Sequence, residues 1–166
     1  MDMQRVTANL FGAWFQISRQ FGPDTLDAIA STVSAGEATH RGELRVAIES
    51  RLPLSAVASD VTARDRAAML FAHLRVWDTD DNCGVLLYVL LAEHRIEIIA
   101  DRGIAKAVTP AEWEAITTHM RDAFAEGRFR EGVQIGVAEA GALLARHFPA
   151  DGRSRENQLP DRPLVL

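Results

Sequence analysis

GVLLYVLLAEHRIEIIAD, residues 84–101, is the stretch of sequence that decides the fold. Residues 84–91 are almost entirely apolar, as expected of a central strand that is covered on both faces. The segment AEH supplies a short turn, after which Ile96 and Ile98 alternate with Glu97. Because two strands joined by so short a turn pair antiparallel, this stretch predicts a β-hairpin.

The sequence before the hairpin predicts a further strand and a helix. Residues 44–48 alternate and read as a strand, with Leu44 and Val46 on one face. Thr62 followed by Asp65 is a variant of the capping box and predicts the start of a helix. Because a helix separates this strand from the hairpin, the first two strands are expected to be parallel neighbours.

Two more helices are predicted after the hairpin. Thr109, Pro110 and Glu112 form a full capping box with proline at the first helical position. The last helix spans residues 129–148 and stops at Pro149.

Helical periodicity also marks the N-terminal part of the chain. Residues 6–21 carry an apolar stripe at helical spacing, which includes Trp14 and is widened by Phe11 and Phe15. Residues 23–41 predict a second helix. The fold class predicted is α/β, with helices packed on both faces of a small mixed central sheet, a three-layer sandwich with an extra N-terminal helix.

Three regions are expected along the chain. Residues 1–22 form an N-terminal helical extension and residues 23–150 form the main domain. Residues 151–166 form an extended tail, because the two prolines of LPDRPLVL forbid a helix.

Composition excludes several classes of function. The chain has 166 residues and a net charge of −5, whereas nucleic-acid binding calls for a basic face. Its longest apolar run is far shorter than the ~20 residues of a transmembrane helix, and its N-terminus does not read as a signal peptide. The single cysteine, Cys83, fits a reducing compartment. We therefore expect a cytoplasmic protein with no transmembrane segment and no nucleic-acid partner.

An acidic loop, WDTDDNCG at residues 77–84, leads into the hairpin. The start of one hairpin strand lies beside the end of its partner, so this loop is expected to lie next to Asp101. Carboxylates gathered in this way repel one another unless a cation, a proton or an arginine intervenes, and hard oxygen ligands suit calcium or magnesium. Glu43, at the start of the first strand, can approach the same edge. The predicted ligands of a calcium or magnesium ion are Asp78, Asp80, Asp81, Asn82 and Asp101.

Three other interpretations of the loop can be compared with this one. An EF-hand is rejected because its sixth and twelfth positions fall on Cys83 and Val89. A phosphotransfer aspartate is disfavoured because such a nucleophile follows a strand, whereas this loop follows a helix. An ordinary polar turn, neutralised by Arg75 and Arg102 without any metal, stays open.

Other catalytic patterns are missing from the sequence. The five histidines lack zinc-ligand spacing, and neither a G-x-S-x-G elbow nor a phosphate-binding G-x-x-x-x-G-K segment occurs. No catalytic residue is assigned.

An ordered series of segments resembles the TPM domain family, also called the TPM phosphatase family. The segments are HRGELRVAIE, DDNCGVLLYVLLAEHRIEIIADRGI, WEAI, FAEGRFREGVQIGVAEAGALLARHFP and LPDRP, and the resemblance covers residues 25–166. It implies an α/β sandwich with a mixed sheet. It also implies divalent-cation binding, calcium in particular, in some members, and acid phosphatase activity in a thylakoid member.

The sequence thus leads to a TPM-like domain that binds calcium or magnesium at the acidic loop, with metal-dependent phosphomonoesterase activity as its catalytic form. The alternative is a non-catalytic interaction module, in which the N-terminal helix or the LPDRPLVL tail binds a protein partner or a second copy of the chain. A third possibility is a metal that only stabilises the fold.

Overall fold

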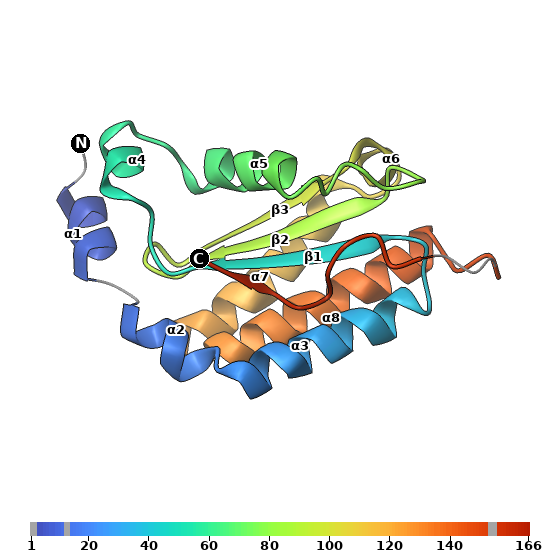
Figure 1. The fold of residues 1–166 in the computed structure, drawn as a ribbon, viewed down its shortest axis with the longest axis horizontal. Coiled ribbons are helices and arrows are strands. Elements are labelled where there is room, and N and C mark those ends of the chain that lie inside the picture. The colour runs from blue at the N-terminus through green and yellow to red at the C-terminus, as the bar shows by residue number, and fades with distance from the viewer. Residues whose placement is uncertain (1–2, 12–13, 153–155) are drawn as a thin grey trace.

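The computed structural model describes residues 3–11, 14–152 and 156–166. One mixed sheet lies between helices on both of its faces, which confirms the predicted three-layer α/β sandwich (Figure 1). The helices are α1 (Met3–Phe11), α2 (Trp14–Gln20), α3 (Pro23–Glu37), α4 (Leu54–Ala58), α5 (Ala63–His73), α6 (Arg102–Ala105), α7 (Pro110–Ala125) and α8 (Phe129–His147). The strands are β1 (Glu43–Glu49), β2 (Gly84–Leu90), β3 (Arg95–Ala100) and β4 (Leu164–Val165).

The strand order is β3-β2-β1-β4. β1 and β2 are parallel, as the intervening helix predicts, and β2 and β3 form the predicted antiparallel hairpin. β4 was not predicted: the C-terminal tail returns to β1 and pairs with it in parallel through Leu164 and Val165. The tail therefore supplies one edge of the sheet, and β3 supplies the other.

Two hydrophobic cores lie on opposite faces of the sheet. On one face Val85, Leu87 and Val89 of β2 pack with α3, α7 and α8, and on the other face Leu86 and Tyr88 pack with α5. Figure 1 shows the two layers, with α3, α7 and α8 below the sheet and α5 above it. Every residue of β2 is buried, as its unbroken apolar run predicts.

Both predicted capping boxes are formed. The Thr62 hydroxyl accepts a hydrogen bond from the Asp65 amide, and the Asp65 carboxylate accepts one from the Thr62 amide at 3.0 Å. Thr109 and Glu112 form the equivalent pair at the start of α7, with Pro110 in the first turn. These caps satisfy amides that have no partner within the helix.

The N-terminal stripe forms two helices, α1 and α2, where one was predicted. Val6 of α1 packs against the α5-side core, and Ile17 of α2 packs against the opposite core. A single straight helix cannot pack against both faces of the sheet. The apolar stripe is therefore divided between two helices, one on each face. The side chains of Phe11, Trp14 and Phe15 lie outside the described part of the structure.

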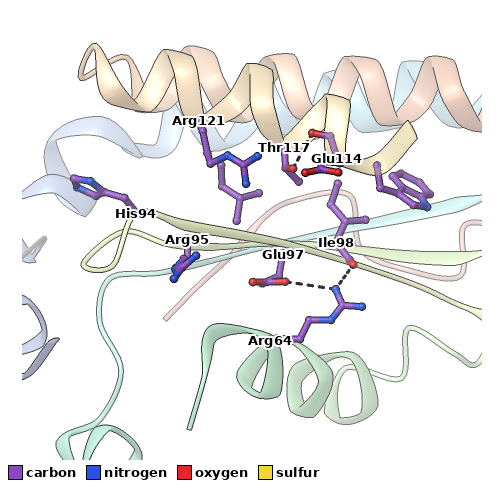
Figure 2. Close-up of a pocket in the computed structure, with 10 residues that line it drawn as sticks. Arg64, His94, Arg95, Glu97, Ile98, Glu114, Thr117 and Arg121 are labelled. Atoms are coloured by element: carbon purple, nitrogen blue, oxygen red, sulfur yellow. Dashed lines mark hydrogen bonds and ion pairs between the residues drawn. The ribbon is translucent and has the colours of Figure 1, made fainter. Parts of the chain in front are cut away.

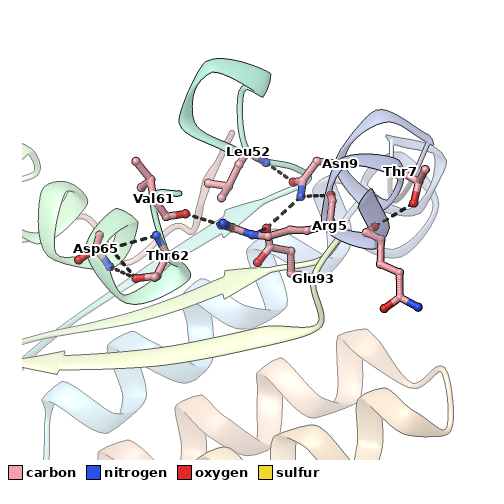
Figure 3. Close-up of polar contacts among 9 residues, drawn as sticks. Arg5, Thr7, Asn9, Leu52, Val61, Thr62, Asp65 and Glu93 are labelled. Atoms are coloured by element: carbon pink, nitrogen blue, oxygen red, sulfur yellow. Dashed lines mark hydrogen bonds and ion pairs between the residues drawn. The ribbon is translucent and has the colours of Figure 1, made fainter. Parts of the chain in front are cut away.

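Polar contacts hold α1 against the rest of the chain (Figure 3). The Arg5 guanidinium lies 2.8 Å from the Glu93 carboxylate, in the turn between β2 and β3. The side chain of Asn9 donates to Glu93 at 2.9 Å and accepts from the Leu52 amide at 2.7 Å. The N-terminal helix is therefore docked on its own domain.

The C-terminal tail is also docked. Leu159 is buried in the α5-side core, and the Arg45 guanidinium donates to the carbonyl oxygens of Pro160 and Arg162. Among the described residues, no helix has the length and apolar character needed to cross a bilayer.

Candidate functional site

The acidic loop lies at the end of the sheet where β1 and β2 begin and β3 ends. The Asp101 amide donates to the Gly84 carbonyl at 2.8 Å, and the Gly103 amide donates to the Asn82 carbonyl at 3.0 Å. These bonds confirm the prediction that the loop before β2 lies beside the segment after β3. α6, which was not predicted because a helix of four residues has no readable period, begins at this junction.

Two glycines allow the loop to lie this close to the sheet. A Cβ atom on Gly84 would lie 1.8 Å from the Val76 carbonyl oxygen, and one on Gly103 would lie 2.5 Å from the Asn82 carbonyl oxygen. Asn82 has a positive φ of 53°, a conformation that asparagine tolerates better than most residues. The loop is therefore held by backbone contacts that leave no room for a side chain.

Asp101 is the predicted ligand with an unsatisfied oxygen. Its Oδ1 atom caps α6 by accepting from the Arg102 amide at 2.7 Å. Its Oδ2 atom is buried and has no hydrogen-bond partner among the described residues. A buried carboxylate oxygen without a partner is costly, so this atom calls for a proton, a water molecule or a cation.

The other predicted ligands lie on the facing loop, and two of them meet arginines. The Asn82 side-chain oxygen accepts from Arg102 Nε at 2.9 Å, and an Asp81 carboxylate oxygen lies 3.4 Å from Arg41 Nη1. Arg102 was expected as a neutralising residue, whereas Arg41 was not.

Asp78 and Asp80 are exposed. Within the described ranges, no group of three or more histidine, cysteine, aspartate or glutamate side chains is arranged so that it could hold a metal ion. The structure thus places the five predicted residues at one junction but does not gather their carboxylates around one point.

A second acidic feature, the pair Glu37 and Glu43, lies at the same end of the sheet. Glu43 is buried, and one of its oxygens lies 3.3 Å from the Leu159 amide. Glu37, at the end of α3, accepts from the Leu44 amide at 3.2 Å. Burial, followed by the charge of Glu43, raises the pKa of Glu37 to about 8. Glu37 was missed because nothing in its local sequence distinguishes it from a solvated helix end.

A cavity of about 570 Å³ opens beside this pair. Glu37, Glu43, Arg41 and the buried His40 contribute to its wall. His40 Nδ1 lies 2.9 Å from the Gly42 carbonyl oxygen, and burial lowers the pKa of its imidazole. Because Arg41 lines the cavity and also contacts Asp81, the cavity and the acidic loop are neighbours.

Comparison with known proteins agrees with this architecture. The sequence profile of the TPM domain matches residues 19–143. The NMR structure of the BA42 protein from the psychrophilic bacterium Bizionia argentinensis is similar, with a TM-score of 0.72 and 27% sequence identity, over 86% of this chain and 92% of that chain. Among curated proteins there is no match. With a matching profile over most of its length and a fold shared with BA42, the chain belongs to the TPM domain family.

Proposed function

We propose that this TPM domain binds a divalent cation, calcium or magnesium, at the junction between the acidic loop and Asp101. The observation that carries the proposal is the buried Oδ2 atom of Asp101, which has no partner among the described residues. A carboxylate oxygen in this state is a hard ligand with an open position, and calcium and magnesium both prefer such oxygens.

The facing loop supplies further oxygen donors. Asp78 and Asp80 are exposed, so their carboxylates can turn toward Asp101 without breaking a buried contact. Asp81 and Asn82 already hold positively charged guanidinium groups, which shows that this loop attracts positive charge. A cation bound here competes with Arg41 and Arg102 for the same oxygens. The ligands proposed are therefore Asp101 with Asp78, Asp80, Asp81 and Asn82.

The test is calorimetric titration of chelator-treated protein with calcium and, separately, with magnesium. Asp101→Asn is expected to weaken binding at least tenfold, because it replaces the buried carboxylate with a neutral amide. Asparagine is as good an N-cap as aspartate, so α6 keeps its cap in this variant. Asp122→Asn on the exposed side of α7 removes the same charge elsewhere and is expected to bind normally. Absence of binding by the wild type, or unchanged binding by Asp101→Asn, contradicts the proposal.

The catalytic form of the proposal is hydrolysis of phosphomonoesters at the same junction. A divalent cation there would polarise a phosphoryl oxygen and lower the pKa of a bound water molecule. Glu37 supports this form, because its pKa of about 8 keeps a proton on its carboxyl group near neutral pH, in a cavity beside the loop. A protonated carboxyl group in this position can act as a general acid toward a leaving alcohol.

A generic phosphomonoester, 4-nitrophenyl phosphate, tests the catalytic form. Turnover that is abolished by a chelator and strongly reduced in Glu37→Gln is expected. Absence of turnover with calcium, magnesium and manganese contradicts the proposed hydrolysis. It does not affect the proposed cation binding, which the calorimetric titration tests.

The alternative of a protein-interaction module has less support. α1 and the C-terminal tail, the two segments that it requires, both contact the body of their own domain through Arg5, Asn9, Leu159 and β4. Removal of residues 1–22 tests this alternative, which predicts loss of self-association with unchanged cation binding.

A further inference from the structure

β3 forms an edge of the described sheet, and half of its backbone groups face outward. In an antiparallel pair, successive residues direct their amide and carbonyl groups alternately toward the partner strand and away from it. The Asp101 amide points toward β2, where it bonds to the Gly84 carbonyl, so Ile96, Ile98 and Ala100 direct theirs away from β2. Within the described part of the chain, no strand pairs with this edge.

The side chain of Arg64, in α5, covers the middle of this edge. Its guanidinium donates to the outward carbonyl of Ile98 at 2.6 Å and lies 3.5 Å from the Glu97 carboxylate. The side chain of Arg64 is 59% exposed, so it can swing away from the strand without opening the core. A charged side chain at an edge strand commonly prevents unwanted pairing with another strand. Here that side chain, Arg64, is free to move.

A cavity of about 240 Å³ follows this edge and reaches both faces of β3. Figure 2 shows Arg64 and Arg95 on the α5 side of the strand and Arg121 of α7 on the opposite side. Three guanidinium groups thus flank one exposed strand, in a chain whose net charge is −5. Glu97 and Glu114 also line the cavity, and the ion pair with Arg64 offsets part of the charge of Glu97.

Arg95 has the greatest freedom to bind a ligand. It is exposed, and within the described ranges it makes no side-chain hydrogen bond or ion pair. Among the residues that the structure describes, the Arg121 guanidinium bonds only to the Thr118 hydroxyl of its own helix, at 3.0 Å. Both guanidinium groups are therefore available to carboxylates that approach along the strand.

We propose that the β3 edge is a docking site for an extended acidic segment of a partner protein, which adds to the sheet as a further strand. Neighbouring side chains of an added strand point to opposite faces of the sheet. Two consecutive acidic residues would therefore reach Arg95 on one face and Arg121 on the other. Arg64 exchanges the Ile98 carbonyl for a carboxylate of the incoming strand and so releases the backbone group that the strand needs. Backbone hydrogen bonds supply affinity in this mode of recognition, and the arginines select for acidic sequences.

Charge favours an acidic segment over a second copy of this chain. A second copy paired through β3 would bring Arg64, Arg95 and Arg121 together with Glu97 and Glu114 to the same edge. Each edge then carries a net positive charge, and the two repel. The site is also separate from the junction around Asp101, so the two proposals stand or fall independently.

The probe is a capped peptide with two consecutive glutamates between β-branched residues, acetyl-VTVEEVTV-amide, titrated into the full chain. Amide hydrogen exchange is expected to slow at Ile96 and Ala100 when the peptide binds, because an added strand bonds to outward amides. Arg95→Gln and Arg121→Gln are each expected to weaken binding about tenfold, because each loses a hydrogen bond to a charged group. Arg146→Gln on α8 removes an exposed arginine away from the edge and is expected to bind as the wild type does.

Three results would overturn the proposal. The first is a lysine peptide, acetyl-VTVKKVTV-amide, that binds as tightly as the glutamate peptide. The second is binding of the glutamate peptide with no change in exchange at Ile96 and Ala100, or no binding at all. The third is light scattering that shows a dimer of the free chain which Arg95→Gln dissociates, because the edge would then be occupied by a second copy.

Discussion

Glu37 is a carboxyl group that folding keeps protonated near neutral pH. Its pKa is about 8 in the folded chain, whereas an unburied glutamate has its ordinary value of 4.5. Between these two values the folded chain binds more protons than the unfolded chain, so the free energy of unfolding falls as the pH rises through this window. Below about pH 4.5 this group has no effect on the pH dependence, because it is protonated in both states.

Glu37→Gln is expected to remove this pH dependence. Glutamine copies the protonated carboxyl group and keeps an oxygen for the Leu44 amide, so the variant should gain stability over the wild type at pH 8 and differ little at pH 4. A difference of one pKa unit between the folded and unfolded states corresponds to about 1.4 kcal/mol, so a gain on the order of 1 kcal/mol or more is expected at pH 8. Thermal unfolding at both pH values measures it, with Glu114→Gln on the exposed side of α7 as the control. An unchanged pH dependence in Glu37→Gln would show that Glu37 is ionised in the folded chain.

The site at the Asp101 junction could be predicted only in part. Hairpin geometry alone brings residues 78–82 next to Asp101, because the register of two antiparallel strands fixes which ends meet. Sequence could not show which oxygen lacks a partner, since this depends on where the side chains of Arg41 and Arg102 reach. Glu37 reaches the same end of the sheet from a helix that precedes β1, and no local pattern carries that information.

At the scale of secondary-structure elements, the connection from α5 into β2 brings two backbone segments very close together. Gly84 begins β2 against the backbone of Val76, and a Cβ atom would lie 1.8 Å from the Val76 carbonyl oxygen. The neighbouring atom belongs to the main chain and cannot turn aside as a flexible side chain would.

Gly84→Ala is therefore expected to lower the free energy of unfolding by about 2 kcal/mol or more, because the start of β2 must move away from Val76. Gly22→Ala is the matched control, because a Cβ atom there meets no heavy atom within 4 Å. Urea denaturation of both variants measures the difference. Equal stability of the two would mean that the loop before β2 moves aside at little cost.

Elements with a long, regular pattern could be predicted, and short ones could not. The apolar run of β2 and the capping boxes at Thr62 and Thr109 identify their elements because each depends on neighbouring residues alone. α4 and α6 are five and four residues long, too short to show a helical period. The division of the N-terminal stripe into α1 and α2 depends on two different cores, which only the folded chain reveals.

At the scale of the whole molecule, the C-terminal tail joins the core on the α5 side of the sheet and forms one edge strand. α5 packs on β2 and β3, and the tail lies over β1 and then pairs with it as β4. Leu159 is 5% exposed and joins the α5-side core. The last segment of the chain is thus a structural part of the domain, although its sequence predicts only an extended tail.

Leu159→Ala is expected to cost about 2–5 kcal/mol, the range for a buried leucine whose cavity does not collapse. Leu54→Ala, at a leucine that is 49% exposed, is expected to cost much less. Chemical denaturation compares the two variants. A small effect of Leu159→Ala would show that the tail contributes little to the core.

Parallel pairing of β4 with β1 gives the molecule a direction of mechanical weakness. Between Leu159 and the C-terminus, the tail is held by a two-residue strand and by hydrogen bonds from Arg45 to two carbonyl oxygens, so a load applied at Leu166 falls on these few bonds before it reaches the core. Under tension β4 would separate first and uncover the edge of β1 at Ala47 and Ile48 while the hairpin and the large helices are still intact. Force applied through a tether at Leu166 would therefore expose the unpaired edge of β1, whereas force applied within the hairpin would not.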